Sequence, residues 1–212
     1  MGVFTQHESS VRAAYLSNAS TIGGGERFIQ ILIGSINSTA VHPQVVCPSE
    51  GPFVHELRAQ GVATTILTPF QPSWRRPRRT LGHWRLWRRW LETAKIALIH
   101  ANSLHVARSV ALSAKSAGLP IICHVHFGLG TEYCEWVFRG LPKPFGFVFC
   151  SKFLQSETGS VLRRLYPTSR QWVLPNAIDV SRFRARGVEI RRAPNSTDRG
   201  PRIGIVAQSA AR

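Results

Sequence analysis

Three consecutive glycines, Gly23 to Gly25, follow a short apolar run and precede a segment whose apolar residues have helical spacing. Consecutive glycines cost chain entropy, and a turn from a strand into a helix can be built with fewer. Because glycine has no side chain, a ligand could approach the main chain here at a helix N-terminus, where free N–H groups and the helix dipole favour negative charge. The stretch therefore predicts either an anion-binding turn or a flexible connection.

Polar side chains stand where several other apolar runs end. In open parallel sheets, ligands bind beyond the carboxyl ends of the strands, so these positions are the candidates for a site. Asn, Ser and His at such positions also cap helices and form turns, so each residue taken singly has a structural explanation as well. Their convergence from several strands favours a site. The candidates are Asn102, Ser103, His124, His126, Ser151, Lys152 and Asn176.

The elements that would position these residues alternate between strand and helix. The change of period along the chain favours βαβ units. We therefore predict an α/β, Rossmann-like three-layer domain with a mostly parallel sheet. The predicted strands span residues 12–17, 42–48, 61–69, 95–102, 119–128, 144–151 and 171–175, and the predicted helices span about 26–36, 52–61, 103–118 and 152–166.

Composition indicates a globular protein whose partners carry negative charge. The 212 residues are 43% hydrophobic, enough for one ordinary core, and 27 Lys and Arg against 11 Asp and Glu give a net charge of +16. Such a balance points to phosphates, nucleic acid or anionic lipid, although coding bias in an Arg-rich genome gives the same excess.

The apolar runs, the N-terminus and the cysteine pattern predict a cytoplasmic protein. No apolar run approaches the roughly 20 residues that cross a bilayer, and the N-terminus lacks the basic start and apolar stretch of a signal peptide. The four cysteines lie far apart without a C-x-x-C pair, so buried free thiols are expected, with no zinc or other metal site.

The segment Pro72–Trp90 combines Arg and Trp without an acidic residue. From Leu81 onward its Trp residues fall near one helical face and its Arg residues around the others. An interfacial helix on anionic lipid has this pattern, and so has a helix that packs its Trp face on the sheet and leaves Arg in solvent. Nucleic-acid binding is a third interpretation, but no recognised nucleic-acid module accompanies the segment, so no nucleic-acid partner is expected.

Five segments, in order, resemble the N-terminal half of family 4 glycosyltransferases, enzymes of the GT-B fold with two Rossmann-like domains facing a cleft. The segments are "LSNASTIGGGER", "HANSLHVAR", "HVHFG", "VFCSKFLQSETGS" and "VLPNAIDVSRF". The most specific part, "LPNAIDVSRF", is similar to the family's P-N-G-[IV]-D-x-x-x-F segment, with Ala177 in place of the usual Gly. The resemblance extends over about residues 12 to 183.

This resemblance implies transfer of a sugar from a nucleotide-diphosphate sugar to an acceptor hydroxyl, with retention at the anomeric carbon and generally without a metal or other cofactor. Gly23, Gly24 and Gly25 would admit the donor's diphosphate to the first helix. His126 would contact the transferred sugar. Strand alternation puts His124 on the same face, so the choice between the two histidines stays open. The weaker candidates for the cleft are Asn102, Ser103, Ser151, Lys152 and Asn176.

The resemblance also implies a division of the chain. Residues 1–183 would form the acceptor-side domain, and 184–212 a basic linker with the first strand of a second domain that in this family holds most of the nucleotide. We therefore expect no turnover by this chain alone. The implied setting is synthesis of polysaccharide, lipopolysaccharide or glycolipid in the cell envelope, with a carbohydrate or lipid-linked acceptor, at the inner face of the cytoplasmic membrane. The alternative is a non-catalytic module that binds an acceptor or a membrane.

Overall fold

A computed structural model describes residues 10–36 and 39–178 of the chain. The predicted segment 184–212 and the boundary after residue 183 lie outside these ranges. The described strands are β1 (Val11–Leu16), β2 (Val41–Cys47), β3 (Ala63–Ile66), β4 (Leu98–Ala101), β5 (Ile121–Val125), β6 (Gly146–Phe149) and β7 (Arg170–Val173). The described helices are α1 (Gly24–Ser35), α2 (Pro52–Ala59), α3 (Pro77–Thr93), α4 (Leu104–Ser116), α5 (Thr131–Val137) and α6 (Lys152–Leu165).

The strands form one seven-stranded sheet in the order β3-β2-β1-β4-β5-β6-β7, and every neighbouring pair is parallel. The Rossmann-like α/β fold predicted from the sequence is thereby confirmed. The chain order reverses between β1 and β4, so the loops after these two strands diverge at that point. In such sheets the crevice at this reversal is where ligands bind.

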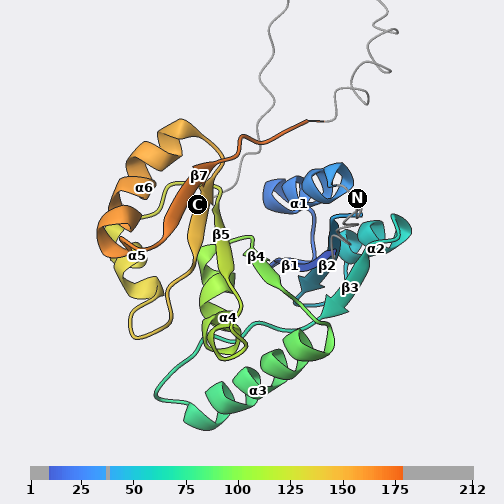
Figure 1. The fold of residues 1–212 in the computed structure, drawn as a ribbon, viewed down its shortest axis with the longest axis horizontal. Helices are drawn as coiled ribbons and strands as arrows, with labels where there is room; N and C mark the ends of the chain where they lie inside the picture. Colours follow the sequence, from blue (N-terminus) through green and yellow to red (C-terminus); the bar gives the residue numbers. More distant parts are fainter. Residues whose placement is uncertain (1–9, 37–38, 179–212) are drawn as a thin grey trace, which may run out of the picture. The chain divides into compact units, whose positions relative to one another are not determined.

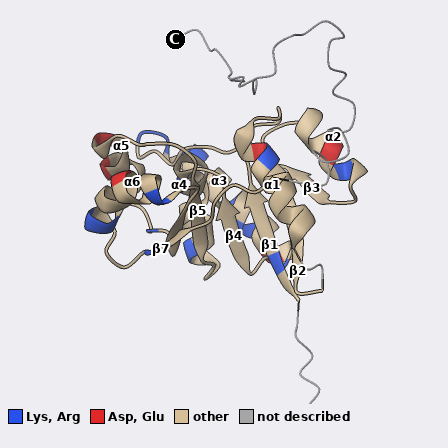
Figure 2. Cartoon of the chain, turned by 90° about the horizontal axis from the view of Figure 1, so that it is seen from above, with Lys and Arg blue, Asp and Glu red and all other residues tan. Residues whose placement is uncertain are grey.

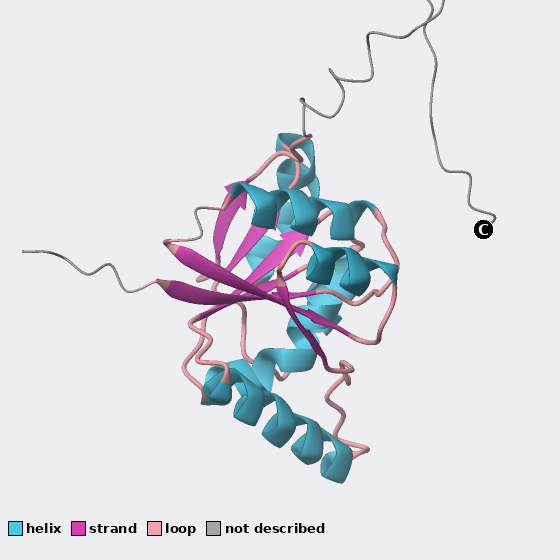
Figure 3. Ribbon diagram, turned by 90° about the vertical axis from the view of Figure 1, so that its right-hand side faces the viewer, coloured by secondary structure: helices cyan, strands magenta, loops and turns pink. Residues whose placement is uncertain are grey.

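Helices cover both faces of the sheet (Figures 1 and 3). The side chains of β1 point alternately to the two faces and show which helices cover each one. Ala13 and Tyr15 pack with residues of α1 and α2 in one buried cluster. Ala14 and Leu16 point to the opposite face and belong to a larger cluster with residues of α3, α4, α5 and α6. Because both faces are buried, the strands read as apolar runs rather than as alternating patterns.

Most predicted elements agree with the structure to within a few residues, and the differences have local causes. Gly61 and Gly118 end α2 and α4 at φ of +75° and +71°, a conformation that favours glycine. Helix α1 begins at Gly24, two residues before the predicted start, so two of the glycines belong to the helix and not to the turn. Helix α5 was not predicted, because its seven residues are too few for a helical period to be seen.

Helix α3 packs its apolar residues on α4, which agrees with the packed-helix interpretation of the Arg/Trp segment. Trp87 and Leu91 are each 1% exposed, and Trp84 Nε1 donates a hydrogen bond to Ser116 Oγ at 3.0 Å. Leu81, predicted on the same face, is exposed. Figure 2 marks the basic and acidic positions, and the exposed arginines of this region are Arg75, Arg76, Arg78, Arg79, Arg85 and Arg89.

Two of the apolar side chains considered for a lipid interface, Trp87 and Leu91, are therefore occupied inside the protein. Contact of Pro72–Trp90 with anionic lipid stays a prediction that depends on the exposed arginines. None of the helices within the described ranges is long and apolar enough to cross a bilayer. Cys47, Cys123 and Cys134 are buried free thiols, as predicted, and Cys150 is partly exposed.

Replacing Trp87 by alanine should lower the free energy of unfolding by about 3 to 5 kcal/mol, because a fully buried ring leaves a cavity. Urea denaturation of both proteins measures the difference. The control is Leu86→Ala in the same helical turn, where a half-exposed side chain should contribute less than about 1 kcal/mol. Equal small losses for both variants would contradict the packing of this helix face.

Candidate active site

The glycine turn joins the end of β1 to the first turn of α1, at the point where the sheet order reverses. Gly23 is the N-cap residue, and Gly24 and Gly25 lie in the first turn, whose N–H groups have no acceptor within the helix. The Glu26 carboxylate holds the turn through two hydrogen bonds. Its Oε2 accepts from the Gly23 N–H at 3.2 Å, and its Oε1 accepts from Ser17 Oγ at 2.8 Å. The turn is therefore held in place rather than loose.

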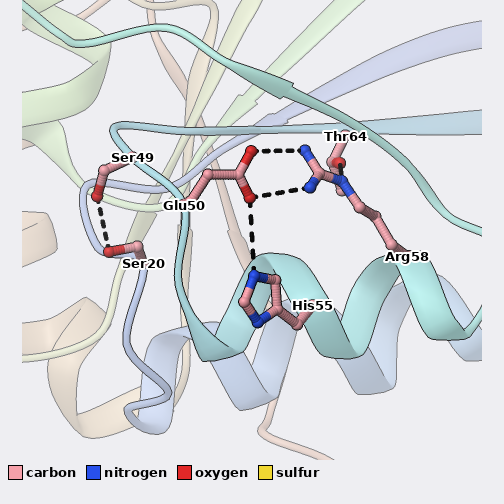
Figure 4. Close-up of polar contacts among 6 residues, drawn as sticks. All are labelled: Ser20, Ser49, Glu50, His55, Arg58 and Thr64. Atoms are coloured by element: carbon pink, nitrogen blue, oxygen red, sulfur yellow. Dashed lines mark hydrogen bonds and ion pairs between the residues drawn. The ribbon is translucent and has the colours of Figure 1, made fainter.

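A second loop supports the same turn from the β2 side (Figure 4). Ser49 Oγ donates to Ser20 Oγ at 2.9 Å, and the Phe53 N–H donates to the Ser20 carbonyl at 3.0 Å. A Cβ on Gly51 would lie 2.6 Å from that carbonyl, so only glycine permits this approach. The bidentate Glu50–Arg58 ion pair, at 2.8 and 2.9 Å, ties the supporting loop to α2.

Gly25, Asn102 and His126 come together from three separate segments of the chain. A Cβ on Gly25 would lie 2.8 Å from Asn102 Nδ2 and 3.7 Å from His126 Nε2. His126 Nε2 and Asn102 Oδ1 are 2.7 Å apart, and because a carbonyl oxygen only accepts, the Nε2 carries the proton in this arrangement. The absence of a side chain at Gly25 thus leaves room for Asn102 and His126.

His124 and His126 lie on the same face of β5 and its continuation, as strand alternation predicted. Their rings are parallel with centroids 4.2 Å apart. His124 is 1% exposed and His126 is only half-buried, so His126 is the one that a ligand can reach. His100 extends the stack from β4, with its Nε2 3.3 Å from His124 Nδ1, and Phe28 of α1 packs edge-on against His124.

Burial keeps these histidines neutral. It lowers the pKa of His100 to about 4, with a further contribution from nearby His126, and it lowers the pKa of His124 well below its usual range. Burial also lowers the pKa of His126, and the charge of Glu26 opposes this change. At neutral pH the stack therefore presents uncharged rings, which donate and accept hydrogen bonds without repelling one another.

Stability should fall on acidification from pH 6.5 to pH 4.5. Because the pKa values of His100 and His124 are lowered in the folded protein, the unfolded chain takes up protons first as pH falls below about 6.5. The expected loss approaches about 1.4 kcal/mol per pH unit for each histidine, measured by urea denaturation. His100→Asn should reduce the slope. A free energy of unfolding that stays constant over this range would contradict neutral, buried rings.

The remaining candidates divide between this site and helix caps. Asn102, Ser103, His124 and His126 line one shallow pocket together with Leu129 and Tyr133. The Ser103 and Ser151 hydroxyls also accept from the N–H groups of Val106 and Leu154, so both cap helices. Lys152 and Asn176 are exposed at strand ends, and the structure does not bring them into contact with the histidines.

Sequence reasoning missed Glu26, Ser17 and His100 as parts of the site. Glu26 had a detectable signal, since a Glu three residues after an N-cap position is typical of a capping box. His100 stands at the end of an apolar run, but its contact with His124 could not be predicted because it depends on how β4 and β5 pair. Within residues 10–36 and 39–178, no group of three His, Cys, Asp or Glu side chains could hold a metal ion.

Comparison with known proteins agrees with this architecture. The model of Glycosyltransferase Family 4 matches residues 22–182. Anabaena HepE in complex with UDP superimposes with a TM-score of 0.61 at 16% identity, over 81% of this chain and 45% of that one. A glycosyltransferase from Rickettsia africae gives a TM-score of 0.57 at 15% identity, over 82% and 45%.

MurG from Acinetobacter baumannii gives a TM-score of 0.53 at 13% identity, over 79% of this chain and 46% of that one. At these identities the likeness shows the fold. The chain spans about half the length of the solved structures that it matches. A sequence search of curated proteins gave no match.

Proposed function

This chain belongs to glycosyltransferase family 4, and on that premise we propose that it is the acceptor-side domain of a sugar-transferring enzyme. The enzyme would transfer a sugar from a nucleotide-diphosphate sugar to an acceptor hydroxyl, with retention at the anomeric carbon. The observation that carries the proposal is the convergence of Gly25, Asn102 and His126 at the reversal point of the sheet. HepE, which has the same fold, was solved with UDP and with UDP-glucose.

In this proposal the first turn of α1 meets the donor's diphosphate. The bond between the anomeric carbon and the diphosphate oxygen breaks as the acceptor oxygen bonds to that carbon, so negative charge grows on the leaving group. The proton of the acceptor hydroxyl passes to an oxygen of the departing diphosphate. Amide N–H groups at Gly24 and Gly25, together with the positive end of the helix dipole, stabilise this charge. Because Glu26 and Ser17 already hold the turn, the donors need little reorganisation during the reaction.

His126 contacts the transferred sugar in this proposal, and Asn102 is a positioning residue. The Asn102 carbonyl fixes the His126 tautomer, which leaves Nδ1 as the acceptor for a sugar hydroxyl. The stacked His124 keeps the ring from tilting. No metal has a role in these steps, so we expect transfer to continue in the presence of EDTA.

The proposed setting follows from the family and from the charge of the chain. A carbohydrate or lipid-linked acceptor of the cell envelope would reach the enzyme at the inner face of the cytoplasmic membrane. The exposed arginines of α3 and the loop before it would favour an anionic surface there. The second domain, with most of the nucleotide contacts, would complete the enzyme.

The alternative is a non-catalytic module that binds an acceptor. Reading the gene downstream of Arg212 separates the two proposals. An in-frame domain with two glutamates about seven residues apart supports the enzyme, and an immediate stop supports the module.

The stereochemical part of the proposal is tested on the protein encoded by the complete reading frame. The product of transfer from an α-linked nucleotide sugar is followed by proton NMR from the first turnover. Retention predicts that the new glycosidic bond is α-linked. A β-linked product would overturn the assignment to retaining enzymes and leave the fold unaffected.

A further inference from the structure

A separate pocket lies on the α4–α5 side of the sheet, between the loop that precedes α3 and the loop that follows α5. Its volume is about 270 Å³, enough for one pyranose ring with a substituent. Trp74, Arg108, Trp136 and Arg139 line it, together with Ser73 and Thr80. None of the strand-end candidates described above belongs to this lining, so the proposed transfer reaction does not explain it.

Arg108 is the unusual member of this pocket, because it is a buried cation without an anionic partner. Its side chain is on α4, and the residue is only 9% exposed. None of the ion pairs among the described residues includes it. Its Nη1 donates to the carbonyls of Trp136 and Val137, while its buried Nε has no hydrogen-bond partner. A buried charge of this kind is costly unless an anion offsets it.

The other charged group in the lining is also basic. Arg139, directly after α5, is exposed at the pocket, and no acidic residue lines the pocket. Burial lowers the pKa of Arg108, which agrees with a site that lacks a negative charge. The pocket thus offers two positive groups, one buried and one exposed, to whatever occupies it.

Two tryptophans give the pocket flat apolar surfaces beside these charges. Trp74 is 89% exposed, although an indole of this size is normally packed, and Trp136 is 42% exposed. The Arg108 guanidinium lies 4.3 Å from the centre of the Trp136 ring and holds that ring at the pocket. The C–H faces of a pyranose pack well on indole rings, while its hydroxyls remain free to bond with the Ser73 hydroxyl. The Thr80 hydroxyl is already bonded to the Ser73 backbone and fixes that loop.

We propose that this pocket binds an acidic sugar, a pyranose that carries a carboxylate or phosphate, with the ring against Trp74 and Trp136 and the anionic group facing Arg108 and Arg139. A neutral sugar would leave the charge of Arg108 unmatched, and a simple anion would leave the indoles uncovered. The site is separate from the strand-end histidines, so it would bind its ligand whether or not the protein transfers a sugar.

Titration of the 212-residue chain with four small probes tests this inference. The probes are glucuronate, glucose 6-phosphate, glucose and inorganic phosphate, and binding is followed by saturation-transfer NMR and calorimetry. We expect a dissociation constant of about 1 mM for at least one acidic sugar. Glucose and phosphate should each bind roughly tenfold more weakly or not at all. The acidic sugar that binds with the lower dissociation constant shows whether the preferred anionic group is a carboxylate or a phosphate.

Variants locate the binding. Trp74→Ala and Arg139→Gln change exposed side chains, so each should keep the melting temperature and weaken acidic-sugar binding roughly tenfold. Their matched controls, Phe153→Ala and Arg89→Gln, change exposed residues elsewhere and should leave binding unchanged. Arg108→Gln should abolish binding, but it also removes bonds to the α5 carbonyls, so the two exposed variants decide.

Three results would overturn the inference. The first is failure of both acidic sugars to bind at 20-fold the expected dissociation constant of about 1 mM. The second is equal affinity for glucose and glucuronate, or for phosphate and glucose 6-phosphate. The third is binding that neither Trp74→Ala nor Arg139→Gln weakens.

Discussion

Replacing Gly24 by valine should lower the rate of sugar transfer about 10³-fold, with a change in melting temperature of less than about 3 °C. Nothing lies within 4 Å of a Cβ built on Gly24, so a side chain there meets open space and not the protein. In our proposal that space is where the donor's diphosphate meets the helix N-terminus. The rate is measured as nucleoside diphosphate release by the protein from the complete reading frame.

Gly34→Val is the matched control, because Gly34 lies in the last turn of the same helix and also has nothing within 4 Å of its Cβ. It should keep the wild-type rate. Gly25→Val is less informative, since its Cβ would displace Asn102 and the loss would combine strain with blocked access. If Gly24→Val and Gly34→Val lose activity and stability equally, the glycine turn is only a connection.

His126→Ala should lower turnover between about 10²- and 10³-fold with little change in melting temperature. The ring is half-buried and lies at the outer end of the histidine stack, so its removal should leave the buried core largely intact. Turnover at saturating donor and thermal unfolding are measured on the same preparation.

The comparison variants for this prediction are His42→Ala, at an exposed position near the start of β2, and Asn102→Ala, which removes the positioning group. The first should leave turnover unchanged, and the second should lower it less than His126→Ala does. A fall in melting temperature of more than about 8 °C for His126→Ala would identify it as a core histidine.

The alternating strands and helices could be predicted because each has a clear period and a clear end, such as the glycines that cap α2 and α4. The start of α1 was predicted two residues late, because glycine has low helix propensity and the capping-box signal of Glu26 was not used. Helix α5 has too few residues to show a period.

For the site, the sequence predicts which face of a single strand a side chain occupies, but it does not predict contacts between residues of different strands. His124 and His126 could be placed on one face by alternation alone. The contact of His100 with His124 depends on sheet pairing, and the contact of Asn102 with His126 depends on two loops. The Arg/Trp pattern of α3 suited both a membrane and a protein surface, and only packing shows that Trp87 is internal.

We propose that these strand ends form half of a nucleotide-sugar transferase. The most direct test of this proposal is the initial rate of nucleoside diphosphate release by the protein from the complete reading frame, measured for a panel of nucleotide-diphosphate sugars with an envelope extract as acceptor source. We expect acceptor-dependent release from at least one donor, lost in Gly24→Val and kept in Gly34→Val. Release from no donor by a folded protein, or release that Gly24→Val leaves unchanged, would contradict it.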